Sequence, residues 1–122
     1  MEVIPDEPGL LTHLRSERDA TLARIRAVSS EFDEIVAGSR DSNADDEHDP
    51  EGSTIAFERA RTAALLEGAR VRLDEVDRAI ARMAEGTYGR CERCGDRISA
   101  ERLAARRAAP WCVRCAAGQQ RR

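Results

Sequence analysis

Apolar residues in the first third of the chain recur at alternating steps of three and four positions, with a polar gap at Arg18, which is a heptad pattern. The stripe consists of Leu11, Leu14, Thr21 or Leu22, Ile25, Val28, Phe32 and Ile35. The positions between them carry mostly charged residues and Ala, which a helix tolerates, and Gly38 is the first helix-stopping residue. The pattern therefore predicts one helix from Leu10 to Ala37.

A second, more regular stripe follows Pro50 and Gly52, where Ser53 or Thr54 is available as the N-cap residue. Its members are Ile55, Leu66, Ala69, Leu73, Val76, Ile80 and Met83, with Arg59 and Thr62 as weaker positions of the same register. We expect Gly86 to end this second helix.

The two predicted helices have similar lengths and a short connection, which favours an antiparallel hairpin in which each helix buries the stripe of the other. We accordingly expect a mainly α protein in which residues 1–86 form a coiled-coil hairpin, with residues 39–53 as its tip loop. A homodimeric coiled coil would bury the same stripes, because a heptad does not reveal whether its partner lies in the same chain. We favour the hairpin, and with it a monomer.

The composition supports extended helices and argues against several classes of protein. Only 3% of the 122 residues are aromatic whereas 35% are charged, which does not suit a β-sandwich, a barrel or a deep substrate pocket. We find no Gly-rich phosphate loop and no nucleophile with a nearby base, so we expect no enzymatic activity. The chain has neither a membrane-length apolar stretch nor the basic start of a signal peptide, so we expect a cytoplasmic protein without membrane contact.

Charge is distributed unevenly along the chain, although the formal net charge is only -3. Residues 1–85 contain eleven Arg and twenty acidic residues, a balance of -9, whereas residues 86–122 contain nine Arg and three acidic residues, a balance of +6. The acidic residues of the predicted tip loop are Asp41, Asp45, Asp46, Glu47, Asp49 and Glu51. Taken alone, such an acidic run is typical of a solvated linker.

The strongest chemical signal is a pair of Cys-x-x-Cys motifs separated by 17 residues. Their members are Cys91, Cys94, Cys112 and Cys115. Two thiolates three positions apart in a tight turn can face one ion, and two such turns complete the tetrahedral sulfur site of structural Zn²⁺. Gly95 suits a turn that requires a positive φ, and we expect Trp111 to pack over the finger. Residues 87–122 contain few apolar side chains, so zinc binding worth about 10–16 kcal/mol would supply folding free energy that burial lacks.

Other chemistries would use the same four cysteines. The reducing cytoplasm disfavours a disulfide framework, and a redox Cys-x-x-Cys normally accompanies a βαβ pattern that this sequence lacks. An iron–sulfur cluster is chemically compatible with four thiolates. Four Cys ligands would leave no position for an activated water, which argues against catalytic zinc. We therefore predict one structural zinc ion, whose excess thiolate charge nearby arginines can compensate.

The residues around the two cysteine pairs form a more specific pattern. An aromatic-Gly-x-Cys-x-x-Cys-Gly start is followed by Ile, Arg-Leu, Ala-Arg, Pro and the second cysteine pair. In this chain the members are Tyr88, Gly89, Cys91, Cys94, Gly95, Ile98, Arg102, Leu103, Ala105, Arg106, Pro110, Cys112 and Cys115. The last thirty or so residues therefore resemble the DksA/TraR C4 zinc-finger family, and the predicted hairpin agrees with that family in layout.

This resemblance implies a function and a partner. Members of the family are bacterial transcription regulators that bind RNA polymerase without contacting DNA, and they insert the coiled-coil tip through the secondary channel toward the active-site Mg²⁺. The resemblance places Asp46 and Asp49, with the neighbouring Asp45, at the polymerase-directed tip. Carboxylates brought to that point could perturb the surroundings of the metal.

Two other functions follow from the residues themselves. The finger could bind DNA or RNA phosphates, in which case binding would weaken steeply with rising salt. The arginines available for this are Arg90, Arg93, Arg97, Arg106, Arg107 and Arg114. Alternatively, the heptad stripes could pair with another chain and make the protein a coiled-coil adaptor.

Overall fold

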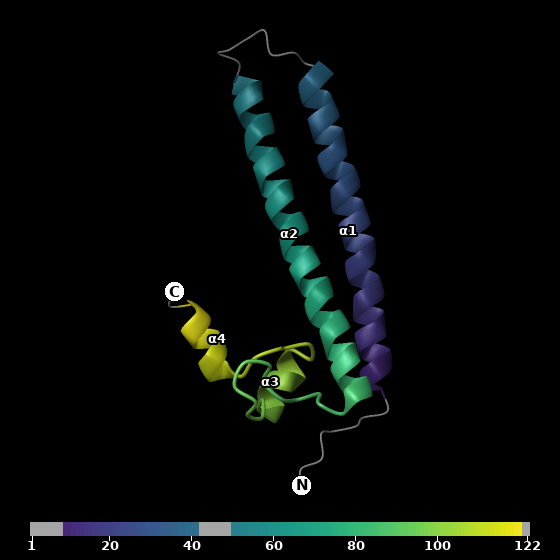
Figure 1. The fold of residues 1–122 in the computed structure, drawn as a ribbon. Coiled ribbons are helices and arrows are strands. Elements are labelled where there is room, and N and C mark those ends of the chain that lie inside the picture. The colour runs from purple at the N-terminus through teal and green to yellow at the C-terminus, as the bar shows by residue number, and fades with distance from the viewer. Residues whose placement is uncertain (1–8, 42–49, 121–122) are drawn as a thin grey trace. The chain divides into compact units, whose positions relative to one another are not determined.

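The computed structural model describes residues 9–41 and 50–120, and these residues form four helices (Figure 1). The helices are α1 (Leu10–Asp41), α2 (Pro50–Glu85), α3 (Ala100–Ala105) and α4 (Val113–Gln120). The extended pairing within the described residues is limited to an isolated antiparallel bridge between Arg90 and Arg97. The predicted fold class, a mainly α chain with two long helices followed by a small finger, is confirmed.

The end of α1 and the start of α2 differ from the prediction. Helix α1 continues through Gly38 to Asp41, because a single Gly costs a helix only about 1 kcal/mol relative to Ala and does not break its hydrogen bonds. Helix α2 already begins at Pro50, since Pro suits the first helical position, so the predicted N-cap at Ser53 or Thr54 is wrong.

The predicted tip loop at residues 39–53 is therefore too long, because its first three and last four residues are helical. The acidic residues Asp45, Asp46 and Asp49, which the prediction assigned to the tip, lie outside the described residues. No helix of the described chain is both long enough and apolar enough to cross a membrane.

The chain divides into two compact units. One contains the part of α1 up to Asp19 together with the chain from Leu73 onward, including the finger, and the other contains Ala20–Arg72. In each unit a segment of α1 lies beside a segment of α2 that runs in the opposite direction (Figure 1). An ion pair of 2.6 Å between Arg18 Nε and Asp77 Oδ1 links the two helices in the first unit.

The heptad stripes are the buried faces of the long helices. Within each helix one heptad position is buried at three successive repeats, and the remaining members of the stripes are mostly half-buried. The six buried residues are Leu14, Thr21, Val28, Thr62, Ala69 and Val76. Thr62, a weak member of the predicted stripe, is only 2% exposed and so belongs to the buried face of α2.

The finger shares one apolar core with the neighbouring ends of the long helices. The buried members of this core are Leu10, Leu14, Val76, Ala79, Tyr88, Cys91, Ile98, Leu103, Ala108 and Cys112, with Trp111 packed partly buried against them. Ala79 is fully buried although it lies outside the predicted stripe. Helix α2 therefore has a second buried face near its end, in addition to the face that meets α1.

Candidate metal centre

The end of α2 directs the polypeptide chain into the metal centre. Gly86 has a φ of +81°, a left-handed conformation that favours glycine and commonly ends helices. The amide of Gly86 donates to the Met83 carbonyl at 3.3 Å, and the amide of Thr87 donates to the Arg82 carbonyl at 2.9 Å. These two bonds form a Schellman motif, which satisfies two of the last four carbonyls of α2 and turns the chain toward the first cysteine pair.

Residues 89–98 form the first zinc knuckle, a tight hairpin that carries Cys91 and Cys94. The Cys91 amide donates to the Asp96 carbonyl and the Ile98 amide donates to the Gly89 carbonyl, each at 2.8 Å. Gly95 has a φ of +82°, as predicted, and its amide donates to the Cys91 carbonyl at 2.9 Å. This turn places both sulfur atoms on the same side of the hairpin.

Residues 110–116 form the second zinc knuckle, which leads into α4. Cys112 lies immediately before α4 and Cys115 lies in its first turn, so helical geometry brings both thiols to one side. The Ala116 amide donates to the Cys112 carbonyl at 2.9 Å. The Glu92 amide donates to the Pro110 carbonyl at 2.8 Å, which joins the two knuckles through their backbones.

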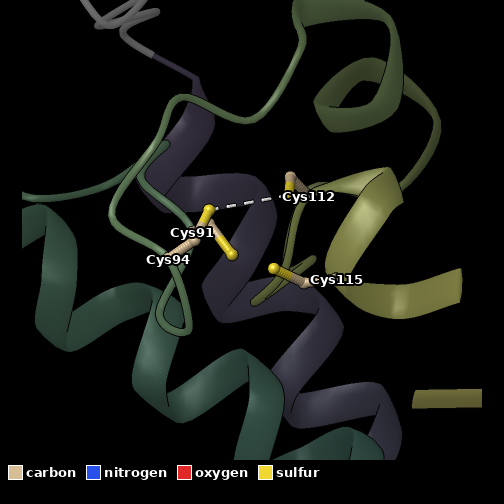
Figure 2. A group of neighbouring side chains, drawn as sticks. All are labelled: Cys91, Cys94, Cys112 and Cys115. Atoms are coloured by element: carbon tan, nitrogen blue, oxygen red, sulfur yellow. Dashed lines mark hydrogen bonds between the residues drawn. The ribbon is translucent and has the colours of Figure 1, made fainter. Parts of the chain in front are cut away.

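The four sulfur atoms converge on one point (Figure 2). All four Sγ atoms lie within 4.8 Å of one another, and those of Cys94 and Cys112 are 3.8 Å apart. In a tetrahedral site with Zn–S bonds of about 2.3 Å, neighbouring sulfur atoms are separated by about 3.8 Å. The cysteines are free of disulfides, and their arrangement therefore fits a single tetrahedral zinc ion.

The pKa values of the thiols also favour the binding of a cation. Burial opposes ionisation of Cys91, but backbone N–H groups of Cys112 and the first knuckle outweigh it and lower the pKa of Cys91 to about 6. Burial and the neighbouring thiols raise the pKa of Cys115 to about 12. The Asp96 amide lowers the pKa of Cys94, yet desolvation and the Cys91 thiol prevail and raise it. Such a cluster becomes four thiolates only when a metal ion offsets their mutual repulsion.

Backbone donors and one arginine surround the sulfur atoms. The Arg93 amide lies 3.4 Å from Cys91 Sγ, and the Asp96 amide lies 3.4 Å from Cys94 Sγ. The Cys112 thiolate, followed by the Asp96 carboxylate, raises the pKa of Arg114. Arg114 therefore compensates charge within the finger, as the sequence suggested for arginines near the site.

Trp111 connects the second knuckle to the rest of the finger. Its ring is half-buried against the finger core, as predicted, and the Arg93 guanidinium lies 5.5 Å from the ring centroid in a cation–π contact. The Arg102 Nε donates to the Trp111 carbonyl at 2.7 Å. Tyr88 is buried and its hydroxyl donates to the Arg107 carbonyl at 2.7 Å. These contacts fix the loop between the two cysteine pairs.

The sequence-predicted metal ligands Cys91, Cys94, Cys112 and Cys115 are all brought together. Glu92, between the first two ligands, pairs with Arg78 and Arg82 of α2, a contact that the sequence did not predict. The sequence holds only a weak signal for this contact. A second face of α2, separate from the heptad stripe, carries Glu75, Arg78, Ala79 and Arg82.

Comparison with known proteins agrees with this geometry. Residues 86–121 match the family model described as the prokaryotic dksA/traR C4-type zinc finger. The chain is 41% identical over 64 residues to General stress protein 16O of Bacillus subtilis (strain 168), a match that covers 52% of this chain and 39% of that protein. It is 47% identical over 47 residues to an uncharacterized protein of Aquifex aeolicus (strain VF5), covering 36% of this chain and 30% of that protein. The matches thus span well under half the length of either relative.

A solved structure shares the fold. The structure of transcription factor DksA2 from Pseudomonas aeruginosa superposes with a TM-score of 0.52 at 24% sequence identity, covering 94% of this chain and 86% of that chain. This similarity concerns the arrangement of the backbone. The family match and the four converging sulfur atoms identify the centre as a site for one structural zinc ion. Residues 86–121 of this chain therefore form a C4-type zinc finger of the prokaryotic dksA/traR family.

Proposed function

We propose that this protein is a cytoplasmic, zinc-containing transcription regulator that acts as a monomer by binding bacterial RNA polymerase. The observation that carries the proposal is the dksA/traR finger at residues 86–121, whose four thiols converge within 4.8 Å in a chain with the fold of DksA2. The proposal concerns a binding protein rather than an enzyme, since four cysteine ligands leave no open position on the zinc ion.

In this proposal the zinc finger and the segment between α1 and α2 have separate roles. The zinc finger stabilises the end formed by the start of α1 and the end of α2, with which it shares an apolar core. The segment of the sequence between α1 and α2 contains Asp45, Asp46 and Asp49, which would enter the secondary channel of the polymerase and act on the surroundings of its catalytic Mg²⁺. Carboxylates suit that role because their oxygen atoms are preferred partners of Mg²⁺ and of its bound water.

Contacts of the finger arginines favour this function over nucleic-acid binding. Arg106 NH2 pairs with Glu75 at 2.6 Å, and Arg114 NH2 pairs with Asp96 at 3.0 Å. Arg102 Nε donates a hydrogen bond to the Trp111 carbonyl. Arginines engaged within the protein are less available for phosphate groups, so we do not expect direct binding of DNA or RNA.

The test combines polymerase binding with transcription initiation in vitro. The zinc-loaded wild-type protein should bind purified bacterial RNA polymerase and change initiation on a panel of promoters. The double variant Asp46→Ala with Asp49→Ala should still bind but lose most of that effect. The matched control is Glu31→Ala with Glu34→Ala, which removes two exposed acids of the same spacing from α1 and should behave like the wild type.

Two results would reject the proposal. Failure of the wild type to associate with the polymerase would remove the partner, and equal transcriptional effects of the wild type and the Asp46→Ala, Asp49→Ala variant would remove the role of the tip. Binding of free DNA that falls steeply between 50 and 200 mM salt, by about three orders of magnitude or more, would instead support nucleic-acid binding by the finger.

A further inference from the structure

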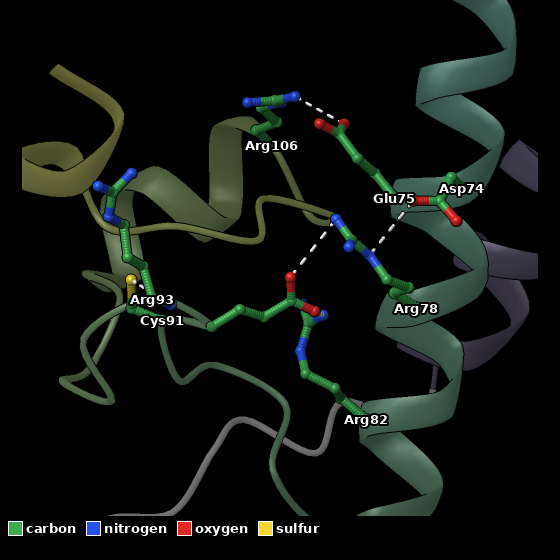
Figure 3. A network of polar contacts seen from close by, with 8 residues as sticks. Asp74, Glu75, Arg78, Arg82, Cys91, Arg93 and Arg106 are labelled. Atoms are coloured by element: carbon green, nitrogen blue, oxygen red, sulfur yellow. Dashed lines mark hydrogen bonds and ion pairs between the residues drawn. The ribbon is translucent and has the colours of Figure 1, made fainter. Parts of the chain in front are cut away.

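The first zinc knuckle contacts α2 through one acidic side chain, that of Glu92. Glu92 stands between the ligands Cys91 and Cys94 in the sequence, and its carboxylate pairs with Arg78 and Arg82 of α2. Figure 3 labels both arginines. One carboxylate oxygen lies 3.4 Å from Arg78 NH2, and the other accepts a hydrogen bond from Arg82 NH1. Although Glu92 as a whole is an exposed residue, its side chain is only 24% exposed.

Arg82 is a buried cation with few partners. Its side chain is 9% exposed, and its Nε and NH2 atoms are buried without a hydrogen-bond partner among the described residues. Glu92 is the acidic residue with which Arg82 forms its ion pair. A buried guanidinium is strongly disfavoured unless an opposite charge lies against it, so the burial of Arg82 depends on Glu92 staying in place.

The surroundings of this pair define the face of α2 that meets the finger. Glu75, Ala79 and Arg82 recur at steps of four and three along the helix, which places them on one side. Ala79 is fully buried in the shared core, and Glu75 pairs with Arg106 of the finger at 2.6 Å. The finger thus contacts α2 through two ion pairs, one formed before Ala79 in the helix and one after it. Figure 3 shows the Glu75–Arg106 pair.

We propose that Glu92 is a positioning residue that couples the metal-bound state of the zinc finger to the stability of α2 from Leu73 to Glu85. When Cys91 and Cys94 hold the metal, the knuckle has one conformation and Glu92 is held against Arg82. When the metal is removed, the knuckle loses that constraint, and Arg82 is left as a buried charge without its counter-ion. The end of α2 then opens more readily. This coupling is a property of the free protein and does not require the proposed binding to polymerase.

Hydrogen exchange of the full-length protein, read by mass spectrometry over residues 73–85, tests the coupling. Samples are compared with one zinc bound per chain and after chelation in the presence of a thiol reductant. In the wild type, chelation should raise exchange over residues 73–85 by at least about tenfold. In Glu92→Gln, exchange should already be raised by a similar factor while zinc is bound, because a neutral amide does not balance the Arg82 charge.

A matched control lies in the same knuckle. Asp96 is an acid close to the same ligands, but it pairs with Arg114 inside the finger rather than with α2. Asp96→Asn removes the same charge near the sulfur cluster and should leave the exchange of zinc-loaded α2 at the wild-type level. Adding Arg82→Met to Glu92→Gln should restore protection, because the unpaired charge is then absent.

Several outcomes would overturn the proposal. The first is that residues 73–85 of zinc-loaded Glu92→Gln are as protected from exchange as in the wild type. The second is that Asp96→Asn loses as much protection as Glu92→Gln. The third is that adding Arg82→Met to Glu92→Gln does not restore protection. If Glu92→Gln does not retain one zinc per chain, the single variant Arg82→Met decides the question. Chelation should then change exchange over residues 73–85 clearly less than in the wild type, and an equal change would reject the coupling.

Discussion

Replacing Val76 by Ala should destabilise the zinc-loaded protein by about 2 kcal/mol. Val76 is 0% exposed and belongs to the core shared by the long helices and the finger. The substitution removes two buried methyl groups, each worth about 0.8 kcal/mol of transfer free energy, and leaves a cavity that costs about 1 kcal/mol more where the surroundings do not collapse. The higher helix propensity of Ala returns about 0.5 kcal/mol.

The matched control is the same substitution five positions earlier in α2. Val71 is 49% exposed, so Val71→Ala loses about half the transfer free energy and no cavity forms. Helix propensity offsets most of that loss, and the expected cost is below about 0.5 kcal/mol. Urea unfolding of both variants, followed by circular dichroism with zinc bound, measures the difference.

Val76→Ala should also weaken zinc binding. The apparent affinity of a structural zinc site includes the free energy of folding the protein around it. A loss of about 2 kcal/mol from the shared core therefore lowers zinc affinity by up to about 30-fold, as measured by competition with a chromogenic chelator. Equal unfolding free energies for Val76→Ala and Val71→Ala would refute the assignment of Val76 to a core that the finger completes.

The metal site allows two further predictions. Gly95→Ala should weaken zinc binding by about five- to thirty-fold, because a φ of +82° costs an L-residue about 1–2 kcal/mol. Gly118→Ala, in the helical part of the finger, should not weaken it. Equal zinc affinities of the two variants would contradict the role of the turn at Gly95. Zinc affinity should also fall steeply as pH decreases from 8 to 6, since the raised pKa values of Cys94 and Cys115 mean that these thiols must each release a proton on binding at pH 7. Calorimetry in buffers of different ionisation enthalpy should count at least two protons per zinc ion, and a count of one or none would contradict the expected thiol states.

The heptad stripes and the cysteine spacing were sufficient to predict the long helices and the metal ligands. Both signals are local and repeated: an apolar residue at every third or fourth position defines a helix face, and two thiols three residues apart in a turn already point the same way. The helix boundaries were predicted less accurately, because α1 continues past Gly38 and α2 starts at Pro50. A single residue of low helix propensity does not outweigh the bonds of a long helix.

Two long amphipathic helices and a four-thiol zinc finger could be predicted from the amino-acid sequence, because both follow from periodic or closely spaced residues. The position of the finger on α2 became clear only from the folded chain. That contact buries Ala79 and joins residues 10 positions apart in the Arg82–Glu92 pair and 31 apart in the Glu75–Arg106 pair. It has no period along the chain, since it depends on how the shape and charge of the finger fit those of α2.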